Sequence, residues 1–209
     1  MRGGSLRDAI FLLAHDEDGR LIITEPAISA GLAGATLIDL LLGRRVAVVG
    51  GRLDVIDSAV TGDPEADAAL AAIAADTGPT GPRAWVSWLA AGAYERVAEA
   101  LDRAGVIRRT TVRRLGLLPA TRCVPANLED LVRLRSRLRY GVHSTQPPDP
   151  ATAALCGLVR VLRLHSSLLL SMPSAQLLDA LAEKAMTADP TVIQVITAVD
   201  SVVSAATYR

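Results

Sequence analysis

The chain has 209 residues, of which 50% are hydrophobic and only 3% are aromatic. This length predicts a single domain over residues 1–209, with a core built from aliphatic side chains. Its 22 basic and 22 acidic residues balance to a formal net charge of zero. The balance excludes a chain disordered by excess charge and argues against a surface that is basic throughout.

Targeting and membrane signals are weak in this sequence. The N-terminal apolar stretch is short and ends in acidic residues, which is not typical of a secretory signal peptide. The most apolar stretch, 155–172, contains Arg160, Arg163 and His165, which argues against a membrane span. We therefore expect a soluble cytoplasmic protein, or a peripheral one on the inner face of the membrane.

Cysteines and histidines suggest no catalytic or metal chemistry. Cys123 and Cys156 lie far apart and fit the role of small buried hydrophobic side chains in a reducing compartment. No two of the histidines His15, His143 and His165 share a metal-binding spacing on one helix. The sequence predicts no metal, no cofactor and no catalytic residue, and hence a protein that is not an enzyme.

Local signals in the first third predict helices and one short hairpin. Two apolar runs around a polar turn fill 6–23, and the first run suits a short helix. Pro26 opens a helix rich in small residues that ends near Gly43. Two β-rich runs then flank Gly50 and Gly51, which is a hairpin signal.

The rest of the chain continues the helical pattern, interrupted by a second hairpin. Asp63 followed by Pro64 predicts a capped helix, and 84–105 predicts one or two helices. The period then changes, and 106–124 predicts a β-hairpin with an arginine-rich face. Further helices are predicted over 127–141, 151–170, 174–187 and 191–208. The fold class is therefore mainly α, a compact helical domain with one projecting hairpin and a second, short one.

Charge is unevenly distributed along the chain. Residues 14–81 carry a net charge of −7, whereas 108–139 carry +7. Such an asymmetry can steer an anionic partner to one side of a protein. The alternative is that these arginines solvate helix faces and pair with acids elsewhere, and charge counts alone favour that alternative.

The basic hairpin supports two binding hypotheses. A helix followed by an arginine-rich hairpin resembles the end of a winged-helix unit, which suggests nucleic-acid binding. The preceding helix, however, carries the acids Glu95, Glu99 and Asp102 and is a poor recognition helix. The second hypothesis is docking on anionic lipid head groups. Nearby, Trp85 and Trp88 are expected to pack in the core, with a membrane-edge contact as the alternative.

The order of several motifs resembles the Golgi phosphoprotein 3 family, including its bacterial, mostly actinobacterial, members. The motifs are FLLAHDEDGRLII, AGLAGATLIDLLLGRRV, TGDPEADAAL, a tryptophan-containing segment, ERVAEALDRAGVI, LGLLPATRCVP and DPATAAL, and together they span about residues 8–165. The resemblance implies a compact helical domain with a projecting hairpin and no enzyme activity. It also implies binding to phosphatidylinositol 4-phosphate and to membrane-protein tails, with self-association through the hairpin.

The family's lipid pocket does not carry over onto this sequence. That pocket uses a tryptophan and an arginine around the first glycine-rich helix, and two arginines one turn apart before the hairpin. A gapless alignment places Thr24 and Ala33 at the first two positions, and counting back from Gly105 places Ala91 and Tyr94 at the others. None of these side chains can replace the bidentate phosphate contacts of arginine.

Other arginines are candidate replacements. Arg20, Arg83 and Arg96 fall near the same elements in the sequence, and their alternative role is that of ordinary surface residues. The hairpin offers a further membrane or oligomer contact through Arg108, Arg109, Arg113 and Arg114.

The sequence therefore predicts a non-enzymatic, peripheral adaptor that binds an anionic, phosphoinositide-like lipid. A protein partner or membrane-protein tail and a homo-oligomer formed through the hairpin are the further partners expected, and nucleic acid is not. The alternatives are a nucleic-acid-binding regulator that uses the hairpin and a cytosolic interaction module that oligomerises through it.

Overall fold

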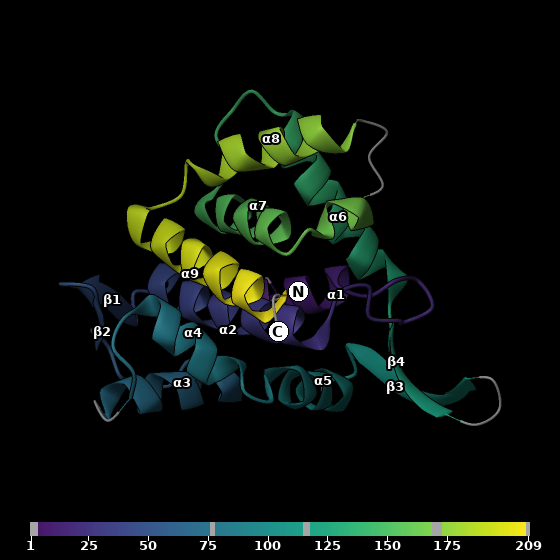
Figure 1. Cartoon of the computed structure of the whole chain (residues 1–209), viewed down its shortest axis with the longest axis horizontal. Coiled ribbons are helices and arrows are strands. Elements are labelled where there is room, and N and C mark those ends of the chain that lie inside the picture. Colours follow the sequence, from purple (N-terminus) through teal and green to yellow (C-terminus); the bar gives the residue numbers. More distant parts are fainter. Residues whose placement is uncertain (1–3, 76–77, 115–117, 169–172, 208–209) are drawn as a thin grey trace.

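The computed structural model describes residues 4–75, 78–114, 118–168 and 173–207, and these are mainly helical (Figure 1). Within these ranges the helices are α1 (Leu6–Leu13), α2 (Glu25–Leu42), α3 (Pro64–Ala74), α4 (Pro82–Ala90), α5 (Ala93–Arg103), α6 (Leu128–His143), α7 (Pro150–Val161), α8 (Ser174–Ala185), α9 (Pro190–Thr207) and the 3-10 helix η1 (Leu164–Leu168). The strands form two antiparallel hairpins, β1 (Val46–Val49) with β2 (Arg52–Val55) and β3 (Ile107–Arg114) with β4 (Leu118–Pro125). The predicted class, mainly α with two hairpins, is confirmed.

Helix α2 occupies the centre of the core. It packs against α1, α3, α4, α5, α7 and α9, and most of its residues are buried. Its small residues allow this close approach, since Gly31 faces the side chain of Leu162 and Gly34 faces Val199 of α9. Among the described residues, α2 is the one helix long and apolar enough to cross a membrane, and 72% of it is buried inside the protein. A helix enclosed by six others in this way is the core helix of the fold.

Two local predictions are confirmed in detail. The Asp63 carboxylate accepts hydrogen bonds from the backbone N–H groups of Glu65 and Ala66, which caps α3. The β1–β2 turn has Gly50 and Gly51 at φ values of 57° and 82°. A two-residue hairpin turn of this kind needs positive φ at both positions, which glycine adopts without strain.

The predicted helical segment 84–105 is divided into two helices. Helix α4 ends at Ala90 and α5 begins at Ala93, with Gly92 between them at a φ of 68°. Glycine tolerates this left-handed conformation, so the chain changes direction there. The change of direction brings the end of α4 against the side of α5.

The continuous helix predicted over 151–170 is wrong. Helix α7 ends at Val161, and Arg163 has a φ of 56°, which a helix does not accommodate. The 3-10 helix η1 follows, and residues 169–170 lie outside the described part of the chain. No glycine or proline marks the break. At this point Leu162 packs against Gly31 of α2, a tertiary contact that the local pattern does not contain.

The β3–β4 hairpin projects from the helical body (Figure 1). Its root is held by burial of Ile107 and Cys123 and by a 2.9 Å hydrogen bond from the Cys123 N–H to the Gly19 carbonyl. Gly19 belongs to the loop between α1 and α2, so the hairpin root is fixed to both the α1–α2 loop and α5. Cys123 and Cys156 are both free and buried, as the sequence predicts.

Candidate functional site

The four positions aligned with the family's lipid pocket lie on α2 and around the junction of α4 and α5. Thr24 is the exposed N-cap residue of α2, and Ala91 is the exposed C-cap residue of α4. Ala33 is buried on α2, beside a cavity of about 20 Å³. A cavity of this size has room for about one water molecule. The space beside Ala33 is therefore far too small for an inositol phosphate.

Arg96 reaches this junction but its guanidinium is already engaged. Its Nη1 and Nη2 donate to the carbonyl oxygens of Ala91 and Leu89 at 2.5 and 3.1 Å. Its Nε donates to Glu65 Oε2 at 3.1 Å, which links α5 to α3. These bonds satisfy carbonyl groups at the C-terminal end of α4. Arg96 therefore has a structural role, because its guanidinium joins the end of α4 to α5 and α3.

Tyr94 lies in a row of aromatic rings at the hairpin root. Its ring stacks on Phe11 with centroids 5.6 Å apart and on His15 with centroids 6.0 Å apart. His15 Nδ1 is 2.7 Å from the Phe11 carbonyl, so this nitrogen carries the proton and donates. Burial lowers the pKa of His15, which keeps the ring neutral and leaves Nε2 to accept from the Tyr94 hydroxyl at 3.1 Å.

The same row continues into the hairpin. The Cys123 thiol lies 3.7 Å from the Tyr94 oxygen and can donate to it. Tyr94 therefore hydrogen-bonds α5 to the start of the α1–α2 loop and to β4 through neutral groups. An arginine there would place a full charge among Phe11, His15 and a buried thiol, which is costly without a counter-charge.

Arg83 and Trp88 form a different arrangement on α4. They line one shallow depression of about 660 Å³, together with Thr80 and Ser87. Trp88 is 53% exposed, whereas Trp85 is 3% exposed and meets it edge to face with ring centroids 5.5 Å apart. The expected core packing is thus confirmed for Trp85 and wrong for Trp88, because only Trp85 faces the body. Within the described part of the chain, Arg83 has no acidic partner.

Arg20 lies on the loop between α1 and α2, beside the hairpin. Its side chain is 61% exposed and 3.7 Å from the exposed Asp18. The structure therefore places the three candidate replacements apart: Arg20 near β4, Arg83 on α4, and Arg96 at the α4–α5 junction. They are not gathered in one pocket, and each stays a separate prediction.

Of the hairpin arginines, Arg109 turns toward α5. Its Nη2 is 2.6 Å from Glu95 Oε2, and its backbone N–H donates to Asp102 at 3.1 Å. The acids of α5 that weaken the recognition-helix hypothesis thus serve to hold β3. This leaves Arg109 less available than its neighbours for an external anion.

The other hairpin arginines lie on either side of Arg109 along β3. Arg108 is exposed near the root. Arg113 and Arg114 lie at the far end of β3, where the register pairs them with Pro119 and Leu118. The side chains of residues 112–120 lie outside the described part of the chain, so the contacts of Arg113 and Arg114 stay predictions.

The comparison with protein families decides the relationship of this chain. The model of one family, Golgi phosphoprotein 3 (GPP34), matches residues 6–202. The chain belongs to the Golgi phosphoprotein 3 family. A search of curated proteins finds no match. The Golgi phosphoprotein 3 family generally comprises adaptors that bind lipids and proteins and are not enzymes.

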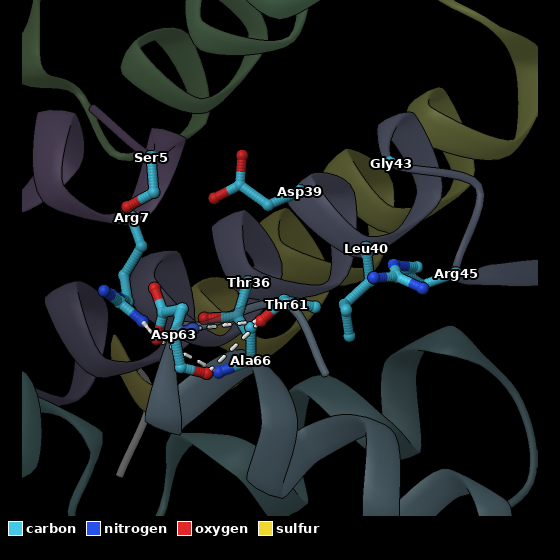
Figure 2. Close-up of a pocket in the computed structure, with 10 residues that line it drawn as sticks. All are labelled: Ser5, Arg7, Thr36, Asp39, Leu40, Gly43, Arg45, Thr61, Asp63 and Ala66. Atoms are coloured by element: carbon cyan, nitrogen blue, oxygen red, sulfur yellow. Dashed lines mark hydrogen bonds and ion pairs between the residues drawn. The ribbon is translucent and has the colours of Figure 1, made fainter. Parts of the chain in front are cut away.

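The sequence alone did not predict one feature of this member of the Golgi phosphoprotein 3 family. A pocket of about 270 Å³, lined by charged, hydroxyl and apolar side chains, opens between α1, α2 and the start of α3 (Figure 2). Arg7, whose side chain is 7% exposed, binds Asp8 at 2.9 Å and Asp63 at 2.8 Å. Arg45 lines the pocket as well and pairs with Asp57. Both guanidinium groups in the lining are thus already neutralised by acids.

Asp39 is the acid of this pocket that forms no ion pair with an arginine side chain among the described residues. Its Oδ1 accepts the Leu6 N–H at 3.2 Å, at the N-terminus of α1, and Figure 2 shows the carboxylate projecting from α2. Burial raises the pKa of Asp39 to about 6, against the lowering effects of that backbone bond and of Arg7. The signal in the sequence was a single acid within an otherwise apolar helical run.

Asp39→Asn is expected to stabilise the protein at neutral pH. A carboxyl whose folded-state pKa exceeds its unfolded value stabilises the fold at low pH, and this contribution is lost as the pH rises from 3.8 through about 6. Asparagine keeps an acceptor for Leu6 without the charge, so we expect a gain of roughly 1–2 kcal/mol at pH 7.5 and little change at pH 4.

Urea denaturation at pH 4 and pH 7.5 measures this difference. Asp200→Asn, on the exposed side of α9, is the control and should leave both values unchanged. A variant that is less stable than the parent at pH 7.5 would show that the Asp39 charge is favourable in the fold.

Proposed function

We propose that this protein is a non-enzymatic peripheral adaptor that docks on anionic lipid at the cytoplasmic face of a membrane. Membership of the Golgi phosphoprotein 3 family supports the class of function. The observation that carries the proposal on this chain is that Arg83 and the exposed Trp88 line the same depression on α4.

Trp88 suits the membrane–water interface, and Arg83 suits the phosphate head groups above it. Tryptophan favours the interface, where its ring is apolar and its N–H reaches water or a head group. A guanidinium binds phosphate oxygens with two parallel hydrogen bonds, and Arg83 lies in the same depression. The depression is shallow, so it suits a head group in a bilayer better than a deeply enclosed ligand.

The selectivity for phosphatidylinositol 4-phosphate is expected to be weak. The aligned pocket positions are Thr24, Ala33, Ala91 and Tyr94, and the cavity beside Ala33 measures only about 20 Å³. The ligand class is therefore an anionic phosphate head group, with selectivity supplied by Arg83 and its surroundings.

Vesicle co-sedimentation of the full chain tests the proposal, with neutral, generally acidic and phosphoinositide-containing vesicles at physiological salt. We expect binding to acidic vesicles and little to neutral ones. Binding confined to phosphoinositide vesicles would assign a specific head-group site. No binding to any of the three would refute the lipid proposal and leave an interaction module.

Two substitutions on α4 are expected to weaken vesicle binding. Trp88→Ala should reduce partitioning about tenfold, and Arg83→Gln about fivefold, the effect of one basic residue near a charged surface. Tyr140→Ala on α6 and Arg160→Gln at the end of α7 are matched controls, because both side chains are exposed on other helices. Equal losses in the controls would mean that the contact is not on α4.

A further inference from the structure

The pocket between α1, α2 and α3 is separate from the Arg83 depression and has its own chemistry. Its volume of about 270 Å³ corresponds to roughly nine water molecules at liquid density. This is slightly below the range of about 300–1,000 Å³ typical of drug-sized ligands. The pocket can therefore hold a small organic molecule.

The arginines of the pocket are unavailable to an anion. Arg7 directs its Nε and Nη2 to Asp8 and its Nη1 to Asp63. Arg45 donates to Asp57 and to the Val60 carbonyl. An anion entering the pocket would have to displace these carboxylates, and it would face the charge of Asp39 as well.

The groups left to a ligand are hydrogen-bond acceptors. Asp39 accepts the backbone N–H groups of Leu6 and Arg7. A carboxylate has about four acceptor sites, so Asp39 keeps capacity for a further donor. The Thr36 hydroxyl donates to the Leu32 carbonyl at 3.0 Å. The Thr61 hydroxyl donates to Asp67 at 2.7 Å and accepts the Asp63 N–H at 3.1 Å, which leaves one lone pair on its oxygen. Each hydroxyl oxygen keeps acceptor capacity. Figure 2 shows Asp39, Thr36 and Thr61 around the same pocket.

The rest of the lining is partly apolar. Leu40 and Ala66 contribute carbon surface beside the polar groups. A ligand that fits therefore has a donor-rich positive end and a short alkyl portion. A primary ammonium has three N–H donors and no acceptor, which complements a carboxylate and two hydroxyl oxygens.

The geometry points to a binding site for a small primary alkylammonium, with its charge on Asp39 and its carbon atoms against Leu40 and Ala66. The ammonium comes either from a free amine or from the ethanolamine head group of a phospholipid. Asp39 is held in place by the N-terminus of α1, so the site is formed before the ligand binds.

Calorimetric titration of the full chain with ethanolamine and putrescine at pH 7.5 tests the site. We expect saturable binding of at least one of them, and binding of choline at least tenfold weaker because its quaternary nitrogen has no N–H. A second arm measures recruitment to neutral vesicles with and without ethanolamine phospholipid. Recruitment by that lipid without binding of free ethanolamine would assign the head group as the source.

Asp39→Asn is expected to weaken amine binding at least tenfold, while Asp200→Asn on α9 keeps it. Binding by the unmodified chain should fall roughly tenfold from pH 7.5 to pH 5, because Asp39 has a pKa of about 6 and the amine stays charged. The groups facing Asp39 are Arg7 and Asp8 from α1, Asp63 from the cap of α3 and Arg45 after α2, and each arginine has an acidic partner.

The outcomes separate this inference from the lipid proposal. Arg83→Gln and Trp88→Ala should keep amine binding, and Asp39→Asn should keep binding to acidic vesicles. Amine binding that survives Asp39→Asn would overturn the assignment of the site. So would the absence of binding in both arms, or binding of inorganic phosphate that is lost on Arg7→Met.

Discussion

Arg7→Met should destabilise the folded protein by about 3 kcal/mol, the lower end of the cost of removing one partner from a buried ion pair. The Arg7 side chain is 7% exposed, while its partners Asp8 and Asp63 keep 26% and 30% exposure. Methionine replaces the apolar stem and leaves both carboxylates without a cation. Burial alone would raise the pKa of Asp63, but hydrogen bonds from Arg7 hold it below its usual value. The free energy of unfolding in urea at pH 7.5 measures the loss.

Two further variants identify the cause of that loss. Adding Asp63→Asn to Arg7→Met should recover part of it, because asparagine still caps α3 and carries no unpaired charge. Arg20→Met is the control, since Arg20 and Asp18 are exposed and such pairs contribute at most about 1 kcal/mol. If Arg7→Met costs no more than Arg20→Met, the pair does not hold α1 to α3.

Gly34→Val should cost about 3 kcal/mol, toward the upper end of the usual range for overpacking a core. A Cβ at Gly34 would overlap the Val199 side chain, and Leu158 closes the space on another side at 3.9 Å. The β-branched side chain has few rotamers in a helix and cannot turn away. Helices α2 and α9 would have to separate, which exposes the centre of the core. Thermal unfolding at neutral pH measures the effect.

The partner residue provides the test of this explanation. Val199→Ala in the Gly34→Val chain should restore part of the stability, since it removes the methyl groups that collide. Ala71→Val on the exposed side of α3 is the control and should cost only the difference in helix propensity, well under 1 kcal/mol. Additive costs for Gly34→Val and Val199→Ala would show that the two residues do not collide.

The elements that were predicted correctly from the sequence are those whose start or turn is determined by residues within a few positions. The β1–β2 turn follows from Gly50 and Gly51, and the starts of α3 and α7 follow from Asp63 and Asp149, which cap them within three residues. The end of α7 was predicted wrongly because Arg163 adopts positive φ without any glycine signal. Its conformation depends on packing between α7 and α2, which no local window contains.

Candidate sites were harder to predict because they depend on atoms from distant segments. Arg96 lies close in sequence to the family's pocket positions, yet its donors are taken by the carbonyl groups of Leu89 and Ala91. The pocket beside Asp39 needs α1, α2 and the cap of α3 assembled around it. Only the isolated acid in an apolar helix was visible, and its partners were not.

The thiols of Cys123 and Cys156 are buried in different parts of the fold, so their reaction with a thiol reagent detects different opening motions. Cys123 lies at the root of the hairpin and Cys156 lies in α7, with exposed fractions of 1% and 0%. Burial raises the pKa of both thiols, so neither forms the reactive thiolate readily in the folded state. A thiol reagent that modifies Cys123 has detected the hairpin leaving the α1–α2 loop and α5. One that modifies Cys156 has detected the helical core itself coming apart, so the native chain distinguishes local from global opening without an added label.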